Sequence, residues 1–122
     1  MYFAGALTLA AETPAGHGYA PFGRHGQSYK FGVVVRPGAT VTVTIGASAR
    51  GHAVIDLSAN GSERGVTSAT YHACRQAGGF YAQGFAFTRP PFRGCVPLDV
   101  TVGGRARVRR VMLSLFAGPC AT

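Results

Sequence analysis

The sequence predicts an all-β fold, and three observations lead to this prediction. Apolar and polar residues alternate with a period of two along much of the chain, which is typical of half-buried strands. Turn-forming residues, including 18 glycines and 7 prolines, separate these segments at intervals of roughly ten residues, as in sandwiches and barrels. No segment has the pattern of a helix of useful length. With 122 residues, 47% of them hydrophobic, the chain is long enough to bury one core of its own.

The first half of the chain supplies four candidate strands. Residues 2–11 are apolar but too few to cross a bilayer as a helix, so we expect them to form the first strand. Residues 29–38 predict a second strand that ends in a Pro-Gly turn. Residues 40–45 read TVTVTI, which places valine and isoleucine on one face and threonine on the other. Residues 52–57 alternate in the same way and put Asp56 on the solvent face.

The second half of the chain supplies the remaining strands. An Asn60-Gly61 pair marks a turn before them, and Pro90 with Pro91 predicts a loop between them. The expected strands are residues 66–73, 79–88, 95–102 and 108–116. The whole chain, residues 1–122, therefore predicts a single antiparallel β-sandwich, immunoglobulin-like or similar, with seven to eight short strands.

Residues 12–28 are rich in glycine and proline and follow no period, so we expect an irregular loop there. Loops of this length in compact domains are often functional.

The residues that carry most enzyme chemistry are scarce and scattered. The four carboxylates and four histidines are Glu12, Asp56, Glu63, Asp99, His17, His25, His52 and His72. No two carboxylates are close enough in sequence to suggest an acid/base pair, and no histidine spacing matches a metal motif. No serine or cysteine lies in a nucleophile motif. We expect a protein that is not an enzyme and needs no metal or cofactor. The alternative is an enzyme with an unrecognised site, built around His17 and His25.

Arginine is the strongest polar feature of the sequence. The 12 basic and 4 acidic residues give a net charge of +8, and Lys30 is the only lysine. Six arginines gather on the last predicted hairpin and on the loop before it: Arg89, Arg93, Arg105, Arg107, Arg109 and Arg110. Guanidinium groups bind phosphates and carboxylates well, so this cluster predicts an anion-binding patch. A charged edge that prevents pairing with strands of other chains explains the same residues more simply.

The position of these arginines on their strand needs an explanation of its own. Arg105, Arg107 and Arg109 share the parity of Val111 and Leu113, which we expect to face inward. Either a bulge intervenes, or the arginines lie beyond the buried part of the sheet, at the tip of the hairpin. A basic surface of this kind favours an anionic envelope polymer, an anionic lipid surface or an acidic protein as partner.

Five aromatic residues lie near the arginines in the sequence: Phe80, Tyr81, Phe85, Phe87 and Phe92. Proteins that bind nucleic acid combine such rings with basic residues. The segment FYAQGFAF alternates as a strand does, however, so packing in the core is the simpler role for its rings. We therefore do not expect nucleic acid to be the partner.

Three cysteines, an odd number, predict one disulfide and one free thiol. If the last strands form a meander, Cys95 and Cys120 lie at one end of the sheet and Cys74 at the other. This arrangement favours a Cys95–Cys120 bond. A Cys74–Cys95 bond is the alternative, and a crossover of the chain between two sheets would permit it.

Several phrases of the sequence, taken in order, resemble a family of uncharacterised actinobacterial proteins. The phrases are YKFGVVVRPGATVTVTI, ARGHAVIDL, TYHAC, GGFYAQGFAF, RGCVPLDVTVGG and a closing GPC. In that family a secreted or membrane-anchored protein carries such a domain near its C-terminus. The resemblance implies a secreted or cell-envelope location and an N-terminal membrane segment that this chain lacks. It implies no activity and no catalytic residues.

These observations together predict an extracytoplasmic, non-catalytic binding or accessory module with a basic surface. A structural or assembly domain that pairs with another chain through an edge strand is the alternative from a different class. The ligand and the oligomeric state stay open at this point.

Overall fold

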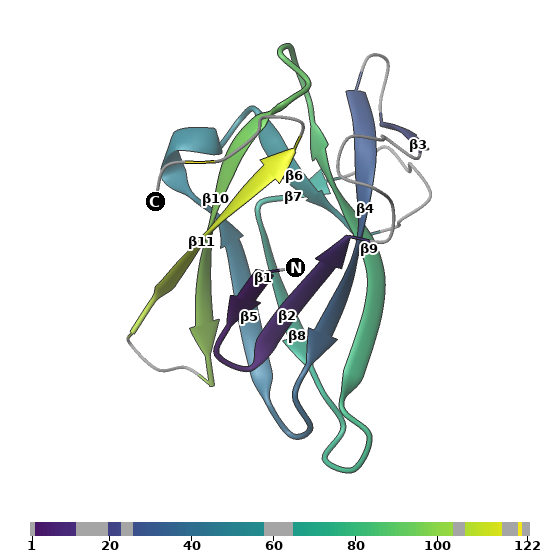
Figure 1. Ribbon diagram of the computed structural model, residues 1–122, viewed down its shortest axis with the longest axis vertical. Coiled ribbons are helices and arrows are strands. Elements are labelled where there is room, and N and C mark those ends of the chain that lie inside the picture. Colours follow the sequence, from purple (N-terminus) through teal and green to yellow (C-terminus); the bar gives the residue numbers. More distant parts are fainter. Residues whose placement is uncertain are drawn as a thin grey trace.

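The protein is a sandwich of two antiparallel β-sheets, seen side by side in Figure 1. The computed structural model describes residues 2–11, 20–22, 26–57, 65–103, 107–115 and 120. The described parts of the chain contain eleven strands, more than the predicted seven to eight. Eight of them have four or more residues, and the other three have two or three. The predicted all-β sandwich is confirmed.

The wider sheet, which we call sheet A, has the strand order β1-β2-β4-β9-β6-β7, with β3 beside β4. Its strands are β1 (Tyr2–Ala4), β2 (Leu7–Ala11), β3 (Ala20–Phe22), β4 (Gly26–Val35), β6 (Ala53–Asp56), β7 (Gly65–Val66) and β9 (Gly79–Phe87). Sheet B has the order β11-β10-β5-β8. Its strands are β5 (Thr40–Ile45), β8 (Ser68–His72), β10 (Gly94–Val102) and β11 (Arg109–Leu115).

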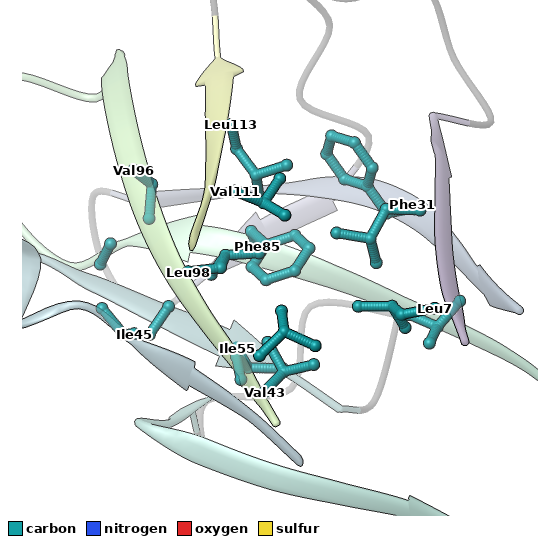
Figure 2. Close-up of a cluster of buried hydrophobic side chains, with 14 of the residues drawn as sticks. Leu7, Phe31, Val43, Ile45, Ile55, Phe85, Val96, Leu98, Val111 and Leu113 are labelled. Carbon is teal, nitrogen blue, oxygen red and sulfur yellow. The ribbon is translucent and has the colours of Figure 1, made fainter. Parts of the chain in front are cut away.

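Alternating apolar residues from the two sheets meet in one core. In β5, for example, Val41, Val43 and Ile45 are buried between partly exposed threonines, as the TVTVTI pattern predicts. Figure 2 shows side chains of both sheets pointing toward one another, with Phe85 of β9 near the middle of the view. Phe31 of β4 meets the edge of the Phe85 ring with centroids 5.3 Å apart, a favourable arrangement for two aromatic rings. Burial of these apolar faces is what holds the two sheets together.

Two predicted segments differ from the structure. Residues 2–11 form two strands, because Gly5 adopts a φ of +61° and lets the chain reverse between β1 and β2. A single glycine within an apolar run gives no period change, so the sequence pattern concealed this hairpin. The loop expected at residues 12–28 contains β3 and the first residues of β4, which pair with each other. Residues 12–19 and 23–25 lie outside the described residues.

A proline in the interior of β10 marks the point where the neighbouring strand β5 ends. Pro97 is opposite Met112 of β11, and its carbonyl accepts a hydrogen bond from Gly46, the residue after β5. The N and the C=O of one residue face the same neighbour in an antiparallel sheet, so the missing N–H of Pro97 costs β11 nothing. A Cβ on Gly46 would lie 2.7 Å from Cγ of Pro97, so only glycine fits here. The chain then crosses to sheet A through a short 3₁₀ turn, Ala47–Ala49.

The structure joins Cys95 to Cys120, the pairing that a meander favours, with the two Cα atoms 5.8 Å apart. Cys74 is free and exposed. The last strands are not a simple meander, because the chain crosses from sheet A to sheet B between β9 and β10. The pairing nevertheless follows, since the β10–β11 hairpin returns the chain to the end of the sheet where β10 begins.

No helix in the described part of the chain is long and apolar enough to span a membrane.

Candidate functional site

A small basic pocket lies between the β1–β2 turn, the residue after β4 and the facing ends of β10 and β11. These elements meet toward the lower end of the sandwich in Figure 1. Its volume is about 180 Å³, and its lining residues are Gly5, Ala6, Arg36, Val100, Val102, Arg107 and Arg109. Pockets for drug-sized ligands are larger, roughly 300–1,000 Å³. The space therefore suits a single phosphate, sulfate or carboxylate group.

Three different elements bring the pocket arginines together. Arg36 follows β4, and its backbone N–H donates to the carbonyl of Ala6 at a distance of 3.0 Å, which ties it to the β1–β2 turn. Arg109 is the first residue of β11 and is opposite Val100 in β10. Its Nε lies 3.8 Å from the place that a Cβ of Gly5 would occupy. The glycine turn and the Arg109 side chain therefore pack closely against each other.

Among the described residues, the pocket carries uncompensated positive charge. None of the described residues that line it is acidic. Of the two carboxylates in the described residues, Asp99 is 2.8 Å from a terminal guanidinium nitrogen of Arg110, and Asp56 is fully buried. Guanidinium groups that face one pocket without a carboxylate repel one another until an anion enters. The arrangement is suited to bind an anion.

The structure divides the predicted arginine patch into separate groups. Arg107 and Arg109 line the pocket, whereas Arg110 points to the outer face of sheet B and pairs with Asp99. Arg89 and Arg93 lie in the loop before β10, at the other end of a strand of nine residues, or about 30 Å of extended chain. Arg105 lies outside the described residues. The described arginines of the predicted patch do not lie together, because the loop and the hairpin end lie at opposite ends of β10, and anion binding by them stays a prediction.

The position of Arg109 explains how a charged residue can share the parity of the inward residues of β11. It has the inward parity of Val111, but it is opposite Val100 near the end of β10, it is exposed, and the buried part of β11 begins only at Val111. Of the two explanations offered by the sequence, the position past the core is the one observed for this residue.

Two further arginines belong to the same end of the molecule, and the sequence analysis missed both. Arg36 lines the pocket, and the Cγ of Arg75 lies 3.7 Å from the place that a Cβ of Gly38 would occupy. We call the four exposed residues Arg36, Arg75, Arg107 and Arg109 the basic pole. The four residues share one feature that can be found in the sequence: each lies at or near the end of a strand. An antiparallel sandwich brings such turns to one side of the molecule.

The possible catalytic residues do not converge in the described structure. His52 bonds through Nε2 to the carbonyl of Pro91 at 2.8 Å, and His72 bonds through Nδ1 to the hydroxyl of Thr40 at 3.1 Å. Both are structural contacts between strands or loops. Glu12, His17, His25 and Glu63 lie outside the described residues. Among the residues that are described, no three ligating side chains form a group that could hold a metal ion.

The prediction that Asp56 faces solvent is wrong. Its exposed fraction is 0%, although it lies on the outer side of β6. Its partner in β9 is Gly84, which is buried too, as is Ala86 on the same side of that strand. The outer face of sheet A is therefore covered at this place, and alternation alone does not predict exposure there.

A second concave region lies beside β8. It has a volume of about 510 Å³, and its lining residues are Leu57, Ala69, Thr70, Tyr71, Phe80, Tyr81 and Gln83. The hydroxyl of Tyr71 donates to Oε1 of Gln83 within it. Burial raises the pKa of Tyr71 to about 12, against the smaller lowering effect of this hydrogen bond and with a further rise from Tyr81. Phe80, expected in the core, is 64% exposed at the rim, because it lies on the outer side of β9.

Comparison of the chain with protein-family models, with curated proteins and with solved structures finds no match. The resemblance to an actinobacterial extracytoplasmic family stays a prediction.

Proposed function

We propose that the protein is a non-catalytic binding module that holds anionic groups of a partner at its basic pole. The observation that carries this proposal is the pocket in which Arg36, Arg107 and Arg109 meet without an acidic residue. Arginine forms paired hydrogen bonds with phosphate and carboxylate oxygens, and three guanidinium groups around about 180 Å³ can surround one such group.

The partner is best sought among polymers that repeat the anionic group. The pocket has room for one group, and Arg75 extends the positive surface toward the β4–β5 turn. A net charge of +8 attracts an anionic partner over a long range. An anionic envelope polymer fits these features, and an anionic lipid surface and an acidic protein share the same chemistry.

An extracytoplasmic location is part of the proposal. It is supported by the Cys95–Cys120 bond, because disulfides form and persist in oxidising compartments. The resemblance seen in the sequence implies the same location.

The proposal is tested by titrating the protein with polyphosphate, polyglutamate and anionic vesicles at several salt concentrations. We expect binding to weaken as salt rises, with about one ion released for each phosphate contact. Replacing Arg107 and Arg109 together by glutamine should weaken binding of the preferred probe by about tenfold or more, since each charge-assisted hydrogen bond contributes measurably.

The matched control replaces Arg89 and Arg93 by glutamine, which removes the same charge from the opposite end of the sandwich. We expect this variant to bind within about threefold of the wild type, because those charges lie about 30 Å away and are screened. Equal losses in both variants would show that net charge, and not the pocket, determines binding. Affinity that does not change with salt would exclude the basic surface altogether. The probe that binds most tightly distinguishes polymer, acidic protein and lipid surface.

A further inference from the structure

The strand β8 ends sheet B, and its outer edge carries free backbone groups. The backbone groups of alternate residues face the same neighbour in an antiparallel sheet. Thr67 and Ala73, at the two ends of β8, bond to residues on the β5 side. The groups of Ser68, Thr70 and His72 therefore face away from β5. Among the described residues no strand pairs with that side.

Natural proteins protect such edges, and β8 carries few of the usual devices. Charged residues, prolines and bulges are the common means of preventing a further strand from adding. The sequence of β8 is SATYH, without lysine, arginine, proline or an acidic residue. Among the described residues, only the carbonyl of His72 on this edge has a partner, the hydroxyl of Tyr81, which donates to it. Within the same part of the chain, the N–H and C=O groups of Ser68 and Thr70 stay available to a further strand.

The concave region beside β8 lies where a further strand of sheet B would place its inward side chains. Ala69 and Tyr71 form the wall on the side of β8. Leu57, which follows β6, and Tyr81 and Gln83 of β9 form the floor. We call this region the β8 groove. Leu57 is 49% exposed in it, which is high for a leucine on the inner side of a sandwich. The groove thus offers apolar surface next to open backbone groups.

A buried polar group in the groove lacks a partner. Gln83 is 2% exposed, and its Oε1 accepts the hydroxyl of Tyr71. Its Nε2 has no hydrogen-bond partner among the described residues, and protein atoms cover it. A buried donor without an acceptor is unfavourable, but a ligand in the groove would not reach it unless this side chain moved. None of the described residues that line the groove is charged, in contrast to the basic pocket.

We propose that the β8 groove binds an extended, uncharged segment of a partner protein, which adds to β8 as a fifth strand of sheet B. Its backbone pairs with Ser68 and Thr70, and an apolar side chain lies against Leu57 and Tyr71. Strand addition of this kind takes affinity from the backbone and specificity from the pockets for alternate side chains.

A single segment fits better than a second copy of the chain. If two β8 strands paired about a two-fold axis, each copy would bring its own wide sheet A to the same side. The floor beside β8 is already formed by Leu57 and Gln83 of one copy, so the second sheet A would need the same space. A peptide needs only the width of one strand, about 4.8 Å.

The test uses a peptide whose pattern suits β8. An acetylated and amidated peptide TVTVTI copies β5, the strand that pairs with the other edge of β8. We expect saturable binding, with amide NMR shifts concentrated at Ser68, Thr70 and His72. A second peptide has the same side chains but carries N-methyl groups on the residues that donate to β8. It should bind at least about tenfold more weakly, because the added hydrogen bonds are lost.

A pair of exposed substitutions tests the groove itself. Leu57→Lys places a charge on the floor of the groove, whereas Val34→Lys places one on the outer face of sheet A, where Val34 is 41% exposed. Both sites are on the surface, and thermal melting checks that each variant folds. We expect Leu57→Lys to weaken the affinity for the peptide about tenfold or more. The affinity of Val34→Lys should stay within about twofold of the wild type.

Four results would overturn the proposal: no saturable binding to the wild type, equal losses in both lysine variants, no effect of N-methylation, or a dimer of the protein that forms through β8. None of them bears on the basic pocket, because the two sites share no lining residue.

Discussion

The two outer strands of sheet B, β11 and β8, end the same sheet in different ways. β11 begins with Arg109 and Arg110, and the disulfide of Cys95 anchors the chain beyond its other end. β8 carries only small, hydroxyl-bearing and aromatic residues and a histidine. Charge and a covalent bond protect the first strand, while the second presents open backbone groups above an uncharged groove. The comparison shows that the two edges of one sheet differ in charge and in their free backbone groups.

The cross-strand contacts between solvent-facing side chains also differ between the two edges. On the β8 side, threonines of β5 form a ladder of neutral hydrogen bonds, such as Thr42 with Thr70 at 2.9 Å and Thr44 with Ser68 at 3.0 Å. On the β11 side, Asp99 and Arg110 form an ion pair. Cross-strand pairs of both kinds stabilise a sheet modestly, but only the second responds to salt.

The largest expected effect concerns the covalent anchor of β11. Replacing Cys95 and Cys120 by serine should lower the free energy of unfolding by roughly 3 kcal/mol, because the unfolded chain regains the entropy of an open loop. Urea denaturation measures the change. Cys74→Ser is the control, and its exposed thiol predicts a change within about 0.5 kcal/mol. Equal stability of the two variants would show that the bond does not hold β11 in place.

The next effect concerns the buried hydroxyl of β8. Tyr71→Phe should cost about 1 kcal/mol at neutral pH, because Oε1 of Gln83 loses its donor. The pKa of Tyr71 is raised from 10.0 to about 12 in the folded protein, chiefly by burial. The unfolded chain therefore loses this proton first, and the stabilising contribution, complete below pH 10, declines as the pH rises toward 12.

This pH dependence is measured by urea denaturation of both proteins across the same range. The wild type should lose up to about 1.4 kcal/mol per pH unit more than Tyr71→Phe. The stability advantage of the wild type over Tyr71→Phe should therefore shrink above pH 10, vanish, and change sign as the pH approaches 12. A difference that stays constant from pH 9 to pH 12 would contradict the buried position of the hydroxyl.

The smallest effect concerns the ion pair of β11. A double-mutant cycle with Asp99→Asn and Arg110→Gln should give a coupling energy of about 0.5 kcal/mol or less, because the pair is exposed to solvent. The coupling should fall further in high salt. A coupling above about 1 kcal/mol that persists in salt would mean that charge contributes more to this edge than its exposure predicts.

The alternation of residues predicted most of the strands, but it did not predict which ends meet. The TVTVTI segment and the inward Val111, Leu113 and Leu115 are buried as expected, because each strand has one face in the core. The basic pocket depends on Arg36, which lies far from Arg107 in the chain. No local pattern connects the two, since only the pairing of strands brings their turns together.

The alternation predicts the exposure of a side chain poorly where another segment of the chain covers, or leaves open, the face on which it lies. Asp56 and Phe80 alternate correctly with their neighbours, yet one is buried and the other exposed. Alternation specifies only on which side of a strand a residue lies. Whether that side is covered depends on other segments of the chain.

The all-β class, the inward faces of the main strands and the excess of positive charge follow from the amino-acid sequence alone. Period-two alternation and composition are local properties that each residue carries with it. The tertiary structure alone decided where that charge is concentrated, which arginine is neutralised by Asp99, and which edge of sheet B stays open. These features depend on contacts between residues distant in the chain, which form only when the two sheets bury their common core.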